Sequence, residues 1–256
     1  MTRFMAVLCA FAALCGCSRT GRQSSASSHP DTASKSYFQV DPATAGSISG
    51  TVRFAGRHPS PVVIDVSSDP ACAAVHLSKV HDDSLILGKQ GQVANAFLYI
   101  KSGLEGKTFS VPSTPVTIDQ RGCLFHPRVL GLQTGQELDI VNSDPVTHNI
   151  HPMAQVNREW NHSQGAGDPP MHRRFLKQEI MIPVKCNIHS WMHAQIGVLD
   201  YPYFAVSAED GSFTIPNLPP GIYVLGVWHE KLGTAEQQVT VTPHGSQTTS
   251  FELRPK

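Results

Sequence analysis

The residues best suited to chemistry stand together in the stretch CNIHSWMH, residues 186–193. This stretch supplies one thiol, two imidazoles and one thioether, from Cys186, His189, Met192 and His193. Thiolate and thioether sulfur favour Cu(I), and imidazole nitrogen suits Cu(II), so a mixed set of this kind serves both oxidation states of copper. The stretch is therefore a candidate ligand loop.

A second stretch, NSDPVTHN at residues 142–149, ends in His148 and Asn149. A short loop between neighbouring strands can bring Cys186, His189 and Met192 to one point. A histidine on an adjacent strand, His148, then attaches the site to the body of the domain. Zinc, or no metal at all, is the alternative for an isolated Cys-x-x-His.

The segments around these residues have the alternation of β-strands. Apolar residues alternate with polar ones in residues 46–54, 134–144 and 236–243. Two further strands are expected within residues 210–228. Residues 93–103 form another strand, residues 68–80 contain one short helix at most, and residues 152–174 are expected to form a long loop. The pattern predicts an all-β sandwich or barrel.

Residues 125–151 and the stretch VKCNIHSWM resemble plastocyanin- and amicyanin-type cupredoxins. The resemblance implies a Greek-key sandwich at residues 106–200 with one type 1 copper. His148, Cys186 and His189 would then lie in the ligand plane, with Met192 as the axial ligand and His193 as the alternative fourth ligand. It also implies that Asn149 braces the ligand loop, and Trp191 beside the ligands would shield the metal.

The remaining histidines are expected to have other roles. His126 is expected to be structural, and His151 to be a hydrogen-bonded neighbour of the site. A second, weaker copper site among His151, His162 and His172 is an alternative.

The flanking segments resemble a different family. GTVRF, AFLYIKSG and DGSFTIPNLPPGIY are similar to carboxypeptidase regulatory-like domains, which are transthyretin-like β-sandwiches. This resemblance implies that residues 46–105 and 201–256 form one such sandwich, with the cupredoxin-like segment inserted into it or packed against it.

The chain begins with a basic residue, an apolar run and LCGC, which resembles a bacterial lipobox. We expect residues 1–17 to be a signal peptide with Cys17 lipidated, and residues 18–45 to be a disordered Ser-rich tether. The protein would then be exported and lipid-anchored to the bacterial outer membrane, facing the periplasm or the cell surface. In an oxidising compartment Cys72 and Cys123 are a disulfide candidate. Two free buried cysteines, or Cys123 as a further metal ligand, are the alternatives.

The chain has 20 Lys plus Arg and 20 Asp plus Glu, and this balance argues against a nucleic-acid partner. Protein ligands fill the expected copper site, so the protein is not expected to be an enzyme. The sequence predicts one-electron outer-sphere transfer between redox partners that it does not identify. Copper storage, delivery or sensing is one alternative, and a carbohydrate-binding or adhesion module is another. The sequence leaves the oligomeric state open.

Overall fold

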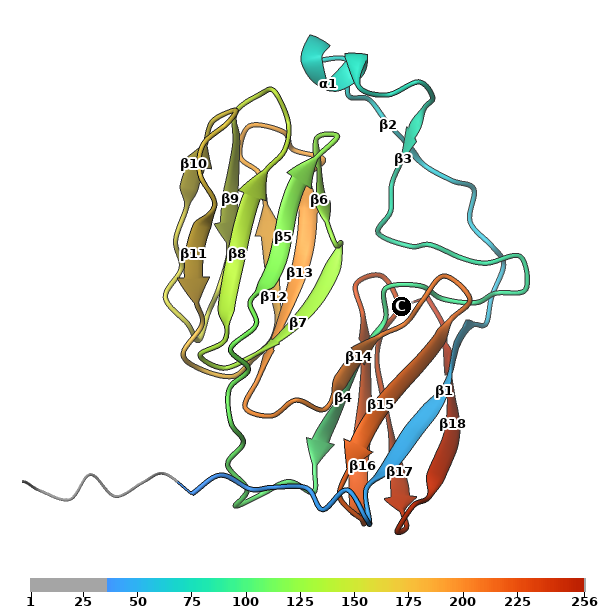
Figure 1. Ribbon diagram of the computed structural model, residues 1–256. Helices are drawn as coiled ribbons and strands as arrows, with labels where there is room; N and C mark the ends of the chain where they lie inside the picture. The colour runs from blue at the N-terminus through green and yellow to red at the C-terminus, as the bar shows by residue number, and fades with distance from the viewer. Residues whose placement is uncertain (1–35, 256) are drawn as a thin grey trace, which may run out of the picture. The chain divides into compact units, whose positions relative to one another are not determined.

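The computed structural model describes residues 36–255, whose regular secondary structure is β-strand apart from one short helix (Figure 1). The predicted all-β sandwich architecture is confirmed. The residues from Ser36 onward form one compact unit. The expected signal peptide, Cys17 and the first part of the tether lie outside the described residues. Within the described part of the chain, no helix has the length and apolar character needed to cross a membrane.

One pair of sheets is built from strands near the two ends of the described chain. The strand orders are β15-β1-β18 and β14-β4-β16-β17. Ile48 and Val52 on β1 are fully buried, as their alternation predicts, and belong to the core of this sandwich. The strands are β1 (Gly46–Phe54), β4 (Phe97–Ser102), β14 (Phe204–Val206), β15 (Ser212–Leu218), β16 (Gly221–His229), β17 (Gly233–Val241) and β18 (Ser246–Leu253).

A second pair of sheets is built from the middle of the chain. The strand orders are β10-β9-β12-β13-β7 and β11-β8-β5-β6. Fully buried Ile118, Ile140, Ile182 and Ile196 lie in the core of this second sandwich. The strands are β5 (Val116–Arg121), β6 (Leu124–His126), β7 (Val129–Gln133), β8 (Glu137–Asn142), β9 (His148–Pro152), β10 (His162–Gln164), β11 (Met171–Arg174), β12 (Glu179–Lys185) and β13 (His193–Leu199).

A short helix, α1 (Pro70–Ala74), lies between the two-residue strands β2 (Val63–Ile64) and β3 (Val80–His81). The Asp69 side chain accepts hydrogen bonds from the amides of Ala71 and Cys72, which the first turn of a helix leaves unpaired. Cys72 is bonded to Cys123 by a disulfide with a Cα–Cα distance of 5.7 Å. The helix is therefore tied covalently to the turn between β5 and β6.

Phe97 on β4 joins the two pairs of sheets. Its ring is fully buried in a cluster with Val129 of β7 and Leu199 of β13. A Cβ atom at Gly197 would lie 2.4 Å from this ring, and one at Gly131 would lie 2.8 Å from it. Both positions therefore require glycine for the ring to pack there.

Two expectations about loops were wrong. Residues 152–174, expected to be one long loop, contain β10 and β11, which pair with β9 and β8. Both are edge strands with mostly exposed side chains, so they lack the apolar alternation that identifies a strand. The described part of the expected tether, residues 36–45, also has structure. The Phe38 amide donates to the Thr108 carbonyl, and the Phe38 ring packs edge-on against Phe109.

Candidate metal centre

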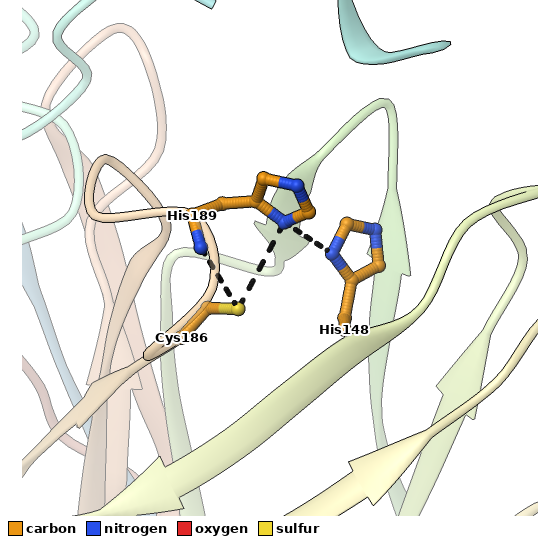
Figure 2. A group of neighbouring side chains, drawn as sticks. All are labelled: His148, Cys186 and His189. Atoms are coloured by element: carbon orange, nitrogen blue, oxygen red, sulfur yellow. Dashed lines mark hydrogen bonds between the residues drawn. The ribbon is translucent and has the colours of Figure 1, made fainter. Parts of the chain in front are cut away.

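Three strands position the candidate ligands. β9 pairs antiparallel with β12, with Lys185 opposite His151, so the first residue of β9 lies beside the end of β12. His148 is that first residue, and Cys186 directly follows β12. The loop from Cys186 to Met192 then returns the chain into β13. His148, Cys186 and His189 consequently point toward one another, as Figure 2 shows.

Hydrogen bonds fold the ligand loop back on itself. The Cys186 amide donates to the Met192 carbonyl at 3.1 Å, and the Met192 amide donates to the His189 carbonyl at 3.0 Å. The His189 amide donates to Cys186 Sγ at 3.4 Å. Met192 is fully buried in the core of the second sandwich. The loop therefore turns its sulfur and imidazole groups inward.

The donor atoms of His148, Cys186 and His189 lie within 4.8 Å of one another. The two Nδ1 atoms of the histidines are 2.9 Å apart, and Cys186 Sγ is 3.9 Å from Nδ1 of His189. All three residues are 0–2% exposed. With bonds of about 2.0 Å to nitrogen and 2.3 Å to sulfur, as in zinc sites, one ion can join Nδ1 of His189 both to Nδ1 of His148 and to Sγ of Cys186.

The far nitrogen of each imidazole faces a carboxylate. His148 Nε2 lies 2.8 Å from Asp144 Oδ2, and His189 Nε2 lies 3.0 Å from Asp69 Oδ2. A neutral imidazole has one N–H, and a carboxylate can only accept, so both protons belong on Nε2. The two Nδ1 lone pairs then face each other at 2.9 Å, an arrangement that a cation between them stabilises. The donor set therefore fits a metal ion.

Burial favours the neutral imidazole that a metal requires. Loss of hydration lowers the pKa of His148, although its hydrogen bond with Asp144 opposes this shift. At the other carboxylate, the hydrogen bond from His189 and that from the Cys72 amide hold the pKa of Asp69 below its usual value. Asp69 is therefore an anionic acceptor for the His189 N–H.

Asp144 is the more enclosed of the two carboxylates. Besides His148, it accepts the amide of Gly122 at 2.6 Å and the amide of Cys123 at 2.7 Å. It is 6% exposed. The turn that carries Cys123 therefore also holds the carboxylate that orients His148.

Asn149 spans the ligand loop and its surroundings. Its Oδ1 accepts the Asn187 amide at 2.7 Å, and its own amide lies 3.5 Å from Cys186 Sγ. Its Nδ2 donates to Asn161 Oδ1 at 2.6 Å. The Trp191 ring lies 5.1 Å from the His189 ring, and its Nε1 donates to the Cys123 carbonyl at 3.0 Å. Asn149 therefore links the ligand loop to Asn161, and Trp191 packs beside His189.

The other histidines lie outside this group. His193 is exposed on β13, opposite Lys185. His126 Nε2 lies 3.1 Å from the Arg121 carbonyl oxygen. His151 contacts Glu159 at 2.5 Å, and the exposed His162 lies on β10.

His172 belongs to a separate, exposed group with two acidic residues. Its Nδ1 lies 2.7 Å from Asp139 and 3.7 Å from Glu137. Among the described residues, no metal-ligand group joins His151, His162 and His172. The alternative of a second site among these three histidines therefore has no support in their arrangement.

Sequence reasoning missed Asp69. The available signal was the Asp-Pro pair, which is typical of a helix start, three residues before one of the paired cysteines. Once Cys72 is bonded to Cys123, Asp69 is brought to the same end of the sandwich as the ligands. Neither the Asp-Pro pair nor the disulfide identifies His189 as the hydrogen-bond partner of Asp69.

Part of this chain is distantly similar in fold to several solved structures. A copper-containing nitrite reductase from Thermus scotoductus is 22% identical with a TM-score of 0.32, covering 40% of this chain and 25% of its own. A purple cupredoxin from Nitrosopumilus maritimus is 17% identical with a TM-score of 0.28, covering 32% and 98% respectively. A reduced amicyanin mutant is 18% identical with a TM-score of 0.30, covering 40% and 97%.

The match thus spans a quarter of the nitrite reductase and nearly all of each small cupredoxin. Residues 180–250 also match the family described as polysaccharide lyase family 4, domain II. No curated protein matches the chain. Because the likenesses are distant and partial, the case for a metal rests on the donor atoms.

Proposed function

We propose that this chain is a copper protein whose single type 1 site carries out one-electron outer-sphere transfer. His148, Cys186 and His189 would hold the ion, with Met192 as the fourth ligand. The observation that carries the proposal is the pair of facing Nδ1 atoms, 2.9 Å apart beside a buried thiol. Both imidazoles commit their N–H groups to carboxylates, which leaves these nitrogens free for a metal.

Copper bound here would supply a centre that alternates between Cu(II) and Cu(I). The chain's own residues hold the donors and exclude water, because the three ligands are 0–2% exposed. Amides of Asn149 and His189 point at Cys186 Sγ and stabilise the thiolate. A site filled by protein ligands leaves no position for a substrate, so we propose a carrier and not an enzyme.

We further propose that the protein is exported and tethered by a lipid on Cys17. The support is the basic start, apolar run and LCGC of the N-terminal sequence. The disulfide between Cys72 and Cys123 is in keeping with an oxidising compartment. Its partners would then be redox proteins of the periplasm or the cell surface.

Storage or delivery of copper calls for easy exchange of the ion. Here His189 lies under Asp69 and the disulfide-bonded helix, which restricts access to the site. This enclosure favours retention of the metal, and therefore electron transfer.

The test is visible absorption of the purified chain after addition of Cu(II). We expect an intense thiolate-to-copper band that Cys186→Ala abolishes, while His193→Ala, which changes an exposed histidine, leaves it unchanged. A blue protein whose band survives His193→Ala would favour Met192 as the fourth ligand, and a red one whose band changes in that variant would favour His193. A chain that binds zinc but gives no such band with copper would contradict the proposal.

A further inference from the structure

The imidazole edge of His189 is closed to a partner protein. Its Nε2 lies 3.0 Å from Asp69 Oδ2 and 3.7 Å from Cys72 Sγ. The Trp191 ring lies 5.1 Å away, and His189 itself is 2% exposed. An electron carrier cannot contact this ligand, so it must approach the site elsewhere.

A hydrogen-bonded route leads from the thiol of Cys186 to the surface. Cys186 Sγ lies 3.4 Å from Asn149 Oδ1 and 3.5 Å from the Asn149 amide. The same side chain donates from Nδ2 to Asn161 Oδ1 at 2.6 Å. Asn161 is exposed, while Asn149 is 3% exposed. Two side chains thus join the ligand sulfur to solvent.

Asn161 lines a groove of about 690 Å³ whose charged side chains are mainly cationic. We call this groove, formed by residues 156–161 and 173–177, the cationic groove. Four cations and a single carboxylate, Glu159, line it together with Trp160. The cations are Arg158, Arg173, Arg174 and Lys177.

Most of this positive charge is not neutralised within the chain. Among the described residues, Arg158, Arg173 and Lys177 form no ion pair, and Arg173 instead lies over the Trp160 ring at 5.5 Å. Arg174 pairs with Glu137 at 2.7 Å. Arginines and an aromatic ring beside an open groove are typical of a surface that binds a partner.

We propose that the cationic groove is the docking surface for an acidic one-electron carrier protein. This inference rests on the proposed electron-transfer function. The reduced carrier would lose one electron, which Asn161, Asn149 and the Cys186 thiolate would conduct to the site, where bound copper would supply the one-electron acceptor. No bond forms or breaks, and no proton moves. In the opposite direction, an oxidised acidic carrier receives the electron by the same route.

The first test uses hexacyanoferrate(II), a small anionic reductant, in place of the carrier. Its reaction with the copper-loaded full chain is followed as bleaching of the thiolate band. We expect the double variant Arg158→Glu, Lys177→Glu to react roughly tenfold more slowly at low salt, because electrostatic steering raises rates by about this factor or more. The wild-type rate should also fall as salt is added.

The matched control is the double variant Lys89→Glu, Arg254→Glu, which changes the net charge equally at exposed positions outside the groove. It should react within about twofold of the wild type, because neither changed residue lines the groove. Equal rates for the two double variants would overturn the docking proposal. A wild-type chain that shows no thiolate band after addition of Cu(II) would instead overturn the proposed function itself.

The second test concerns the route. Asn161→Ala removes the acceptor of the Asn149 side chain but leaves the bond between Asn149 and the Asn187 amide. We expect an unchanged thiolate band and slower reduction, whereas His162→Ala, at the next exposed residue, leaves both unchanged. Equal reduction rates for the two variants would show that Asn161 does not carry the electron.

Discussion

Asp69 Oδ2 lies 3.0 Å from His189 Nε2, although 120 positions separate the two residues. The other oxygen of the same carboxylate accepts the amides of Ala71 and Cys72 at 2.9 and 3.3 Å. One side chain therefore begins α1 and orients a candidate ligand. Because the disulfide fixes α1 to the second sandwich, the orientation of His189 depends on a segment far from it in sequence.

Asp69→Asn tests the charge of this acceptor. Asparagine caps a helix as well as aspartate does, so α1 should persist. A carboxylate makes the imidazole a stronger donor to Cu(II), so its loss should raise the reduction potential, by about 60 mV if the preference for Cu(II) falls tenfold. Redox titration of the thiolate band measures the shift. The control is Asp65→Asn, which changes a carboxylate that accepts a hydrogen bond from the Ser67 amide. Equal reduction potentials in the two variants would contradict the prediction.

Asp144→Asn should weaken metal binding. Asp144 accepts two backbone amides and the His148 N–H, and an asparagine NH2 group would face at least one of these donors. Changes to groups that orient metal ligands cost about 10–100-fold in affinity. Competition with a copper chelator measures the loss. Asp139→Asn, at an acceptor of the exposed His172, should bind copper like the wild type, and equal affinity in the two variants would argue against a role for Asp144.

Removal of the disulfide should destabilise the fold and open the centre. The bond closes a loop of 51 residues, and loss of such a bond typically costs 2–5 kcal/mol in the free energy of unfolding. Cys72→Ser with Cys123→Ser should therefore unfold at lower denaturant concentration. The folded variant should also lose copper to a chelator faster than the wild type. If both proteins lost copper at one rate, α1 would not be restricting access to the metal.

His229 should make stability depend on pH. It is 2% exposed, and burial lowers its pKa from the ordinary 6.5 to about 4, although the nearby Glu230 opposes the shift. Arg128 and Lys231 also face it and favour the neutral form. Between pH 6.5 and 4 the unfolded chain binds a proton that the folded chain does not. The free energy of unfolding should therefore fall by about 3 kcal/mol as the pH is lowered through this range.

Urea denaturation at several pH values measures this slope. His229→Gln cannot titrate, so its stability should fall less steeply between pH 6.5 and 4, whatever its absolute stability. Parallel slopes in the two proteins would exclude His229 as the source.

Part of the architecture could be predicted because strands such as β1 place apolar residues at alternate positions. The fully buried Ile48 and Val52 on β1 follow the expected period of two. The edge strands β10 and β11 could not be predicted in this way. Each lies at the edge of a different sheet with mostly exposed side chains, so polar residues such as His162 and Arg173 are accepted there.

Only part of the candidate site could likewise be predicted from the sequence. The prediction that His148 would lie with Cys186 and His189 relied on a loop between neighbouring strands, and the structure brings their donor atoms within 4.8 Å. The role of Asp69 could not be predicted, because it depends on the path of a long irregular segment and on a disulfide. Local sequence patterns do not record contacts of that kind.

The bond between Cys72 and Cys123 also implies an order of maturation. While both thiols are reduced, the helix that covers His189 is not tied down, and three cysteines compete for an incoming soft metal ion. Oxidation leaves Cys186 as the single free cysteine in the described chain and closes the helix over the imidazole. If the proposed site binds copper, we therefore expect a chain whose disulfide has already formed to take up the ion more slowly than a reduced one.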